Sequence, residues 1–207
     1  PDGRVRLVGH SLGGNVVMHY AGVRPERVDR VVSLEGFGIP AEVADDAPRK
    51  IAKWLDAIKS PPRFKPYDGI AAVADRLQRQ NALLPRDKAE FLAHRWARTL
   101  PDGRAELNSD PRHKMPFPHV YRLEESIAIW RSVQAPVLWV AATESEIPRW
   151  IERNTGGDVG SDGLAGVRRR LAHVRNGRLA TISEAGHMLH HDQPAAVAGA
   201  IEPFLAA

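Results

Sequence analysis

A serine set among glycines, a glutamate at a predicted strand end and a late histidine are the residues of this chain whose types and order could do chemistry. Ser11 lies in the run Gly9-His10-Ser11-Leu12-Gly13-Gly14, followed along the chain by Glu35 and finally by His187. A serine hydroxyl is a weak nucleophile at neutral pH unless a base takes its proton, and that base needs an orienting acid. The order serine, acid, histidine therefore predicts a hydrolytic triad.

The turn around Ser11 has the composition that such a nucleophile requires. A β-rich run covers residues 5–8, and residues 15–21 have apolar side chains at helical spacing, so the serine falls between a strand and a helix. Gly9 and Gly13 are expected to leave room where this strand and helix nearly touch. The hydroxyl is then held clear of the backbone at a helix N-terminus, where developing negative charge is favoured.

Composition excludes several classes of protein. The 207 residues are 43% hydrophobic and 26% charged, as in ordinary globular proteins, without an apolar run of membrane-spanning length, and we expect a cytoplasmic enzyme. The absence of cysteine excludes disulfides and thiolate chemistry. The net charge of +4 is spread along the chain, and the arginine run 168–170 is interpreted as a solvated helix face, so no nucleic acid is expected. His190 and His191 lack a matching carboxylate cluster, so no metal is expected.

Alternating strand and helix signals predict an α/β fold that is interrupted by a helical insert. The core is expected over residues 1–39 and 135–207, and the insert, read as a cap or lid, over residues 40–134. Strands are expected at 4–9, 28–34, 135–142 and 178–183, and helices at 12–23, 47–59, 68–80, 86–98, 123–133, 163–174 and 194–205.

These motifs resemble those of the α/β-hydrolase superfamily. Gly186-His187, followed by Asp192-Gln193-Pro194, is similar to the family's histidine loop, and the turn at Ser11 is similar to its nucleophile elbow. The resemblance covers residues 4–39 and 135–207, while the segment between them resembles the variable cap. It implies a mostly parallel sheet with flanking helices, Ser11 as nucleophile, His187 as base, and no cofactor.

The acid of the triad has three candidates. Most members of the family carry an aspartate after the later strand, at a position that falls near Ser145 here, and the glutamates Glu144 and Glu146 flank it. Glu35 directly follows the preceding strand, where one subgroup of haloalkane dehalogenases carries a glutamate. The resemblance to dehalogenases ends there, because they use an aspartate nucleophile. The sequence favours Glu35, then Glu146, then Glu144.

The predicted chemistry is acyl transfer to a serine. Ser11 would attack an ester or similar carbonyl of a small or medium apolar substrate while His187 accepts the proton. The backbone N–H of Leu12 is predicted to donate to the oxyanion, and His10 and Phe37 are predicted to contact the substrate. Ser11 disfavours epoxide hydrolase and dehalogenase chemistry, which leaves a C–C bond hydrolase as an alternative.

A second alternative arises because part of the expected site is missing from this sequence. The loop that supplies the second oxyanion donor in related enzymes is not found in the sequence, and the strand at residues 5–8 is expected to be an apolar sheet edge. We therefore expect this chain to be the C-terminal portion of a longer hydrolase, or to be completed by a second chain. A non-catalytic binding or scaffold protein is the alternative that follows if the site is incomplete.

Overall fold

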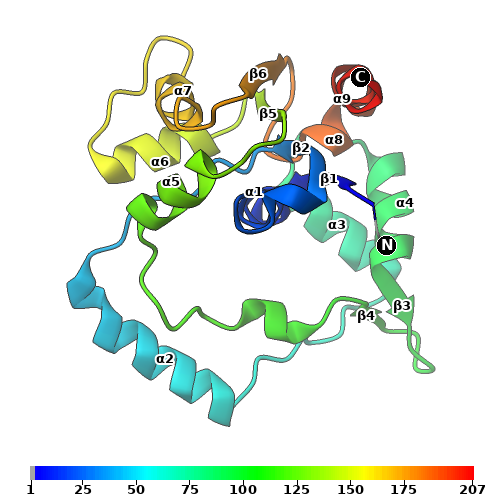
Figure 1. Cartoon of the computed structure of the whole chain (residues 1–207). Helices are drawn as coiled ribbons and strands as arrows, with labels where there is room; N and C mark the ends of the chain where they lie inside the picture. The colour runs from blue at the N-terminus through cyan, green and yellow to red at the C-terminus, as the bar shows by residue number, and fades with distance from the viewer. Residues whose placement is uncertain (1–2) are drawn as a thin grey trace. The chain divides into compact units, whose positions relative to one another are not determined.

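The structure is a computed structural model, and it describes residues 3–207. The first two residues of the predicted core segment 1–39 lie outside the described residues. The chain divides into two compact units (Figure 1). The first unit runs to Ala41 and resumes at Tyr121–Ala207, and the second is Glu42–Val120.

A four-stranded sheet forms the centre of the first unit. Its strands, in spatial order, are β1 (Val5–His10), β2 (Val28–Leu34), β5 (Val137–Ala142) and β6 (Gly177–Ile182). All neighbours are parallel, and β5 is buried at every position, as expected for a strand covered on both faces. The predicted α/β fold with a mostly parallel sheet is confirmed. Over residues 3–207, β1 is the terminal strand of the sheet, and Val8 on it is 45% exposed.

Helices cover both faces of this sheet. They are α1 (Leu12–Val23), the 3₁₀ helix η1 (Pro25–Arg27), α5 (Leu123–Arg131), α6 (Ile147–Thr155), α7 (Ala165–Leu171), α8 (Leu189–Asp192) and α9 (Pro194–Ala206). Successive strand residues point to opposite faces, so Val31 and Trp139 pack with α1, α5 and α6, whereas Val32 and Val140 pack with α8 and α9. No helix within residues 3–207 combines the length and the apolar character needed to cross a bilayer.

The second unit has a small core of its own. Its elements are η2 (Ala44–Asp46), α2 (Ala47–Lys59), α3 (Ile70–Gln80), α4 (Arg86–Trp96), β3 (Ala97–Thr99), β4 (Ala105–Leu107) and η3 (Pro111–Lys114). Helices α3 and α4 pack together around Val73, Leu77 and Ala93. The antiparallel pair β3 and β4 was not predicted, because β3 begins within the helix expected at 86–98 and β4 lies where no element was expected.

The predicted insert, residues 40–134, extends further along the chain than the second unit does. Helix α5 belongs to the first unit, because it packs against α1 so closely that a Cβ atom on Gly22 would lie 2.2 Å from the backbone oxygen of Ile129. Trp130 on α5 is buried in the core next to Trp139. The role of the second unit as a cap stays a prediction.

Candidate active site

Ser11 occupies the sharp turn between β1 and α1 that its sequence context predicts. Its backbone lies at φ 54° and ψ −118°, a region that residues other than glycine rarely adopt. Its N–H donates to the backbone oxygen of Leu34 at 2.8 Å, which continues the pairing of β1 with β2 up to the serine. The turn is therefore strained and is held by the sheet beside it.

The glycines around this turn have different roles from those predicted. Gly9 is crowded as expected, because a Cβ atom there would lie 2.2 Å from the backbone oxygen of Gly13. The expectation for Gly13 itself was wrong, since a Cβ atom there would meet nothing within 4 Å. Gly14 is the second crowded position, with a Cβ atom 2.4 Å from Ser33 Oγ and 3.0 Å from Gly36 Cα.

These two adjacent glycines offer a matched test of the crowding. Gly13→Ala is expected to leave stability unchanged or to raise it by up to about 1 kcal/mol, because alanine favours the helix and the space is open. Gly14→Ala is expected to lower the free energy of unfolding by about 1–3 kcal/mol, because neighbouring atoms must move. Urea unfolding of both variants measures the difference, and equal midpoints would contradict it.

Glu35 sits in a second strained turn, directly after β2. Its backbone φ is 55°, and the next residue, Gly36, would place a Cβ atom 2.7 Å from Gly14 Cα and 2.8 Å from the backbone oxygen of Ser11. The turn that carries Ser11 and the turn that carries Glu35 are thus in direct backbone contact, at Gly14 and Gly36, with no side chain between them. This contact between Gly14 and Gly36 sets the spacing of the two side chains, and the sequence analysis missed it.

The carboxylate of Glu35 is buried and fully engaged. The residue is 2% exposed, and its Oε1 atom accepts the N–H of Ala142 at 2.8 Å. Its Oε2 atom accepts both the hydroxyl of Ser145 and Nδ1–H of His187, the latter at 3.2 Å. Ser145, which falls where related enzymes usually carry the acid, is itself buried and acts as a donor to Glu35. Hydrogen bonds from several donors stabilise a carboxylate that is buried in this way.

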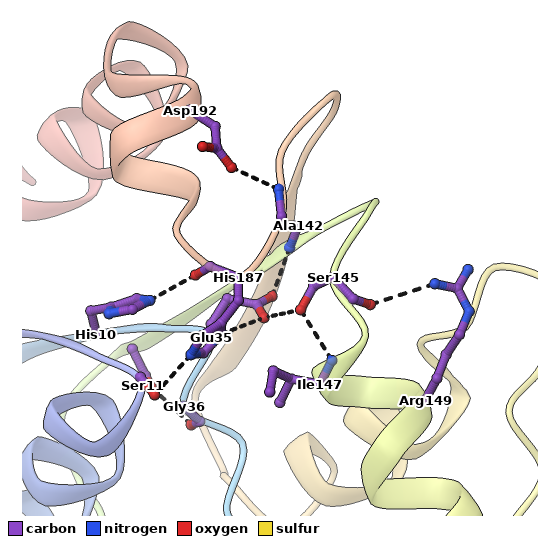
Figure 2. Close-up of polar contacts among 12 residues, drawn as sticks. His10, Ser11, Glu35, Gly36, Ala142, Ser145, Ile147, Arg149, His187 and Asp192 are labelled. Carbon is purple, nitrogen blue, oxygen red and sulfur yellow. Dashed lines mark hydrogen bonds and ion pairs between the residues drawn. The ribbon is translucent and has the colours of Figure 1, made fainter. Parts of the chain in front are cut away.

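His187 lies between the other two side chains, in the loop that follows β6. Its Nε2 atom is 2.9 Å from Ser11 Oγ, while Nδ1 faces Glu35 (Figure 2). A carboxylate only accepts hydrogen bonds, so Nδ1 carries the proton and Nε2 is left to accept the serine hydroxyl. The three residues come from three separate turns at the carboxyl ends of β1, β2 and β6 of one parallel sheet, where ligands bind in open α/β sheets.

The residues after His187 explain the motif seen in the sequence. The backbone N–H of Gly186 donates to Asp192 Oδ2 at 2.9 Å, and the side-chain amide of Gln193 donates to the backbone oxygen of Glu184 at 3.3 Å. Pro194 then begins α9. Asp192 and Gln193 thus close the loop that presents His187.

The two other candidate acids lie elsewhere. Glu146 is exposed and forms ion pairs with Arg149 at 3.5 Å and Arg153 at 3.0 Å. Glu144 is also exposed, and its carboxylate accepts the hydroxyl of Thr143 at 3.2 Å. The carboxylate that contacts His187 is that of Glu35.

The remaining predicted site residues fall in different surroundings. Leu12 is the first residue of α1, so its N–H lies outside the hydrogen-bond ladder of the helix, as an oxyanion donor requires. His10 donates from Nε2 to the backbone oxygen of His187 at 2.7 Å. Phe37 is instead fully buried, with its ring 5.5 Å from that of Trp139, so it contributes to the core.

A row of histidine rings lies beside His187. The ring of His10 is 4.8 Å from that of His187 and 4.5 Å from that of His190, and the rings of His190 and His191 are 4.2 Å apart. Burial lowers the pKa of His10. Burial, followed by the proximity of His191 and His10, lowers the pKa of His190 to about 4. Within residues 3–207, no group of three His, Cys, Asp or Glu side chains could hold a metal ion.

The low pKa of His190 has a consequence for stability. Its unfolded value is near 6.5 and its folded value about 4, so between these pH values the unfolded chain binds more protons. Stability is expected to fall as the pH drops from 6.5 to 4, by at most about 1.4 kcal/mol per pH unit and by less because the ring is partly exposed. Thermal unfolding over this range should show a shallower dependence in His190→Gln than in the wild type. An equally shallow pH dependence in the control variant His94→Gln, which changes an exposed histidine, would show that His190 is not the cause.

The arginine run on α7 is only partly the solvated face that was expected, because Arg168 and Arg169 are exposed but Arg170 is buried. Arg170 is 6% exposed and donates to the backbone oxygens of Phe37 at 2.7 Å and Ile39 at 3.2 Å, and burial lowers its pKa. It therefore holds the segment that leaves Glu35. The expectation was wrong for Arg170 because a helix of this length turns one side of the run inward.

Comparison with known proteins gives the family. Residues 1–200 match the model of the alpha/beta hydrolase family. A serine hydrolase-like protein of Danio rerio is 26% identical over 98% of this chain and 60% of its own length, and one of Dictyostelium discoideum is 23% identical over 96% and 55%. The chain thus spans about 55–60% of the length of these two curated relatives.

Solved structures agree with this match. The crystal structure of a hypothetical protein from Pseudomonas aeruginosa PAO1 superposes with a TM-score of 0.78 at 27% identity, over 99% of this chain and 68% of that one. The thioesterase domain from the curacin biosynthetic pathway has a TM-score of 0.74 at 23% identity, over 98% and 66%, and shows the same fold. With its parallel sheet, strained serine turn and histidine loop, the chain belongs to the alpha/beta hydrolase family.

Proposed function

We propose that this protein is a serine hydrolase that cleaves an ester or similar acyl bond of a small or medium apolar substrate. The single observation that carries the proposal is the continuous path from Ser11 Oγ to His187 Nε2, at 2.9 Å, and from His187 Nδ1 to Glu35, at 3.2 Å. A nucleophile, a base and an orienting acid within hydrogen-bond reach are what acyl transfer to serine requires. The membership of the chain in a family of hydrolases supports it.

The roles follow from the protonation states. Ser11 Oγ attacks the carbonyl carbon as its proton moves to His187 Nε2, and the carbonyl oxygen becomes an oxyanion at the N–H of Leu12. The imidazolium, stabilised by the Glu35 carboxylate, then gives its proton to the leaving alcohol, and an acyl-serine forms. Water attacks this ester with His187 again as base, which releases the carboxylic acid and restores the serine.

Labelling with a fluorophosphonate tests this function. The reagent phosphonylates an activated serine, so we expect one adduct per folded chain. After digestion with trypsin, the adduct should be found on the peptide of residues 7–27, in which Ser11 is the single serine. Heat-unfolded protein is the control and should not react. An adduct on another residue, equal labelling of the unfolded chain, or no labelling of the folded chain would overturn the proposal.

A further inference from the structure

A cavity of about 560 Å³ lies within the second unit, and its lining includes none of the residues of the proposed triad. Residues of α3, α4, β4 and η3 and of the loops beside them surround it. Small-molecule sites in proteins have volumes of about 300–1,000 Å³, so this cavity can hold a ligand. Its lining residues are Phe64, Val73, Arg76, Leu77, Gln80, Arg95, Trp96, Leu107, Asn108, Ser109, His113 and Lys114.

One wall of this cavity is apolar. Val73 and Leu77 project from α3 and are buried, and Leu107 on β4 and Trp96 at the end of α4 also line it. Trp96 remains 41% exposed although its neighbours Ala93 and Ala97 are buried. An apolar chain placed against this wall would remove hydrocarbon surface from water on both sides.

The charged side chains of the lining are all cationic. Arg76, Arg95 and Lys114 all line the cavity, whereas the lining includes no aspartate or glutamate. Within residues 3–207, none of the three forms an ion pair with a carboxylate. By contrast, Arg86 and Arg98 of the same unit are both paired with acids.

Aromatic rings contact all three of these cations, with the guanidinium of Arg95 5.4 Å from the ring centre of Phe91. The guanidinium of Arg76 lies 5.6 Å from the ring centre of Tyr67 and donates to its hydroxyl, and the ammonium of Lys114 lies 4.7 Å from the ring centre of Phe64. Such contacts position a cation while leaving its charge uncompensated. Donors thus remain for an anionic ligand, which an arginine binds best as a carboxylate or phosphate.

We propose that this cavity binds an amphiphilic carboxylate, with the hydrocarbon chain along Val73, Leu77 and Leu107 and the carboxylate among Arg76, Arg95 and Lys114. The apolar wall fits a hydrocarbon chain, and the three cations without carboxylate partners favour an anionic head group. This inference goes beyond the proposed function and does not depend on it, because the cavity contains none of Ser11, Glu35 and His187.

Isothermal titration of the 207-residue chain with decanoate, below its micelle concentration, tests the proposal. We expect one site per chain, at least tenfold weaker binding of decanol, which lacks the charge, and no binding of acetate, which lacks the chain. Affinity for decanoate should fall as salt is added, because Arg95 and Lys114 are solvent exposed. Equal binding of decanol, or of the cation decyltrimethylammonium, would overturn the proposal.

Variants locate the site. The double variant Arg95→Gln, Lys114→Gln changes exposed side chains, so the fold should be kept, and it is expected to weaken decanoate binding at least tenfold. The matched control is Arg98→Gln, an exposed arginine of the same unit that does not line the cavity. An equal loss in the control would assign the binding to general surface charge. Fluorophosphonate labelling of the double variant should be unchanged, so failure here is distinguishable from failure of the proposed triad.

Discussion

Ser11→Ala is expected to reduce the hydrolysis of a short apolar ester, such as 4-nitrophenyl butyrate, by about a million-fold, to the background rate of the solution. Serine nucleophiles that act as a unit with their base show losses of this order, because no other group at the site can form the acyl-enzyme. The substitution removes only Oγ, which donates to His187 Nε2 and, within residues 3–207, forms no other side-chain hydrogen bond. The fold should therefore be retained, and circular dichroism checks this.

The control for this variant is Ser132→Ala, which removes an exposed serine hydroxyl in the same unit. Its rate of ester hydrolysis and its fluorophosphonate labelling should equal those of the wild type. Residual activity of Ser11→Ala within tenfold of the wild-type rate would show that another nucleophile does the chemistry. That outcome would refute the assignment of Ser11.

Glu35→Gln is expected to lower kcat for the same ester by about 10⁴-fold with little change in KM. A carboxylate accepts Nδ1–H of His187 and stabilises the imidazolium, whereas an amide nitrogen at that place favours the wrong tautomer. The glutamine keeps the size of the side chain, and its oxygen can still accept the N–H of Ala142. The loss should therefore appear in turnover far more than in stability, and steady-state kinetics together with thermal unfolding separate the two.

The same change at Glu146 is the matched control. Glu146→Gln alters an exposed carboxylate that pairs with Arg149 and Arg153, so kcat should remain within about twofold of the wild type. Glu144→Gln should behave in the same way. A large loss in either control, with Glu35→Gln near wild type, would move the acid to the turn after β5.

Much of the fold could be predicted because the strands of a parallel sheet are continuous apolar runs. The strand expected at residues 28–34 has the same bounds as β2, and the run at residues 137–142 is buried along its whole length. The hairpin of β3 and β4 could not be predicted in this way. Its strands have three residues each, and Arg98 and Glu106 pair across it as solvated charges, so no apolar periodicity marks it.

The residues of the candidate site that stand in short sequence motifs could be predicted. Ser11 and His187 stand in such motifs, and Glu35 could be favoured because it directly follows a strand. The hydrogen-bond partners of Glu35 depend instead on the register between β2 and β5. Leu34 pairs with Val140 in the sheet, and this places the carboxylate against the N–H of Ala142 and the hydroxyl of Ser145, a contact between distant parts of the chain.

The strained turns set a limit on how this protein could be engineered. Ser11, Glu35 and Glu184 all have positive φ values of 53–55°, where glycine is accommodated at lower cost than any other residue. A laboratory selection for heat resistance alone would therefore enrich glycine at all three positions. At Glu184 the exposed side chain is dispensable for the proposed chemistry, but at the other two positions the same enrichment would select folded proteins without a nucleophile or an acid. Selection for heat resistance therefore has to be coupled to a screen for turnover.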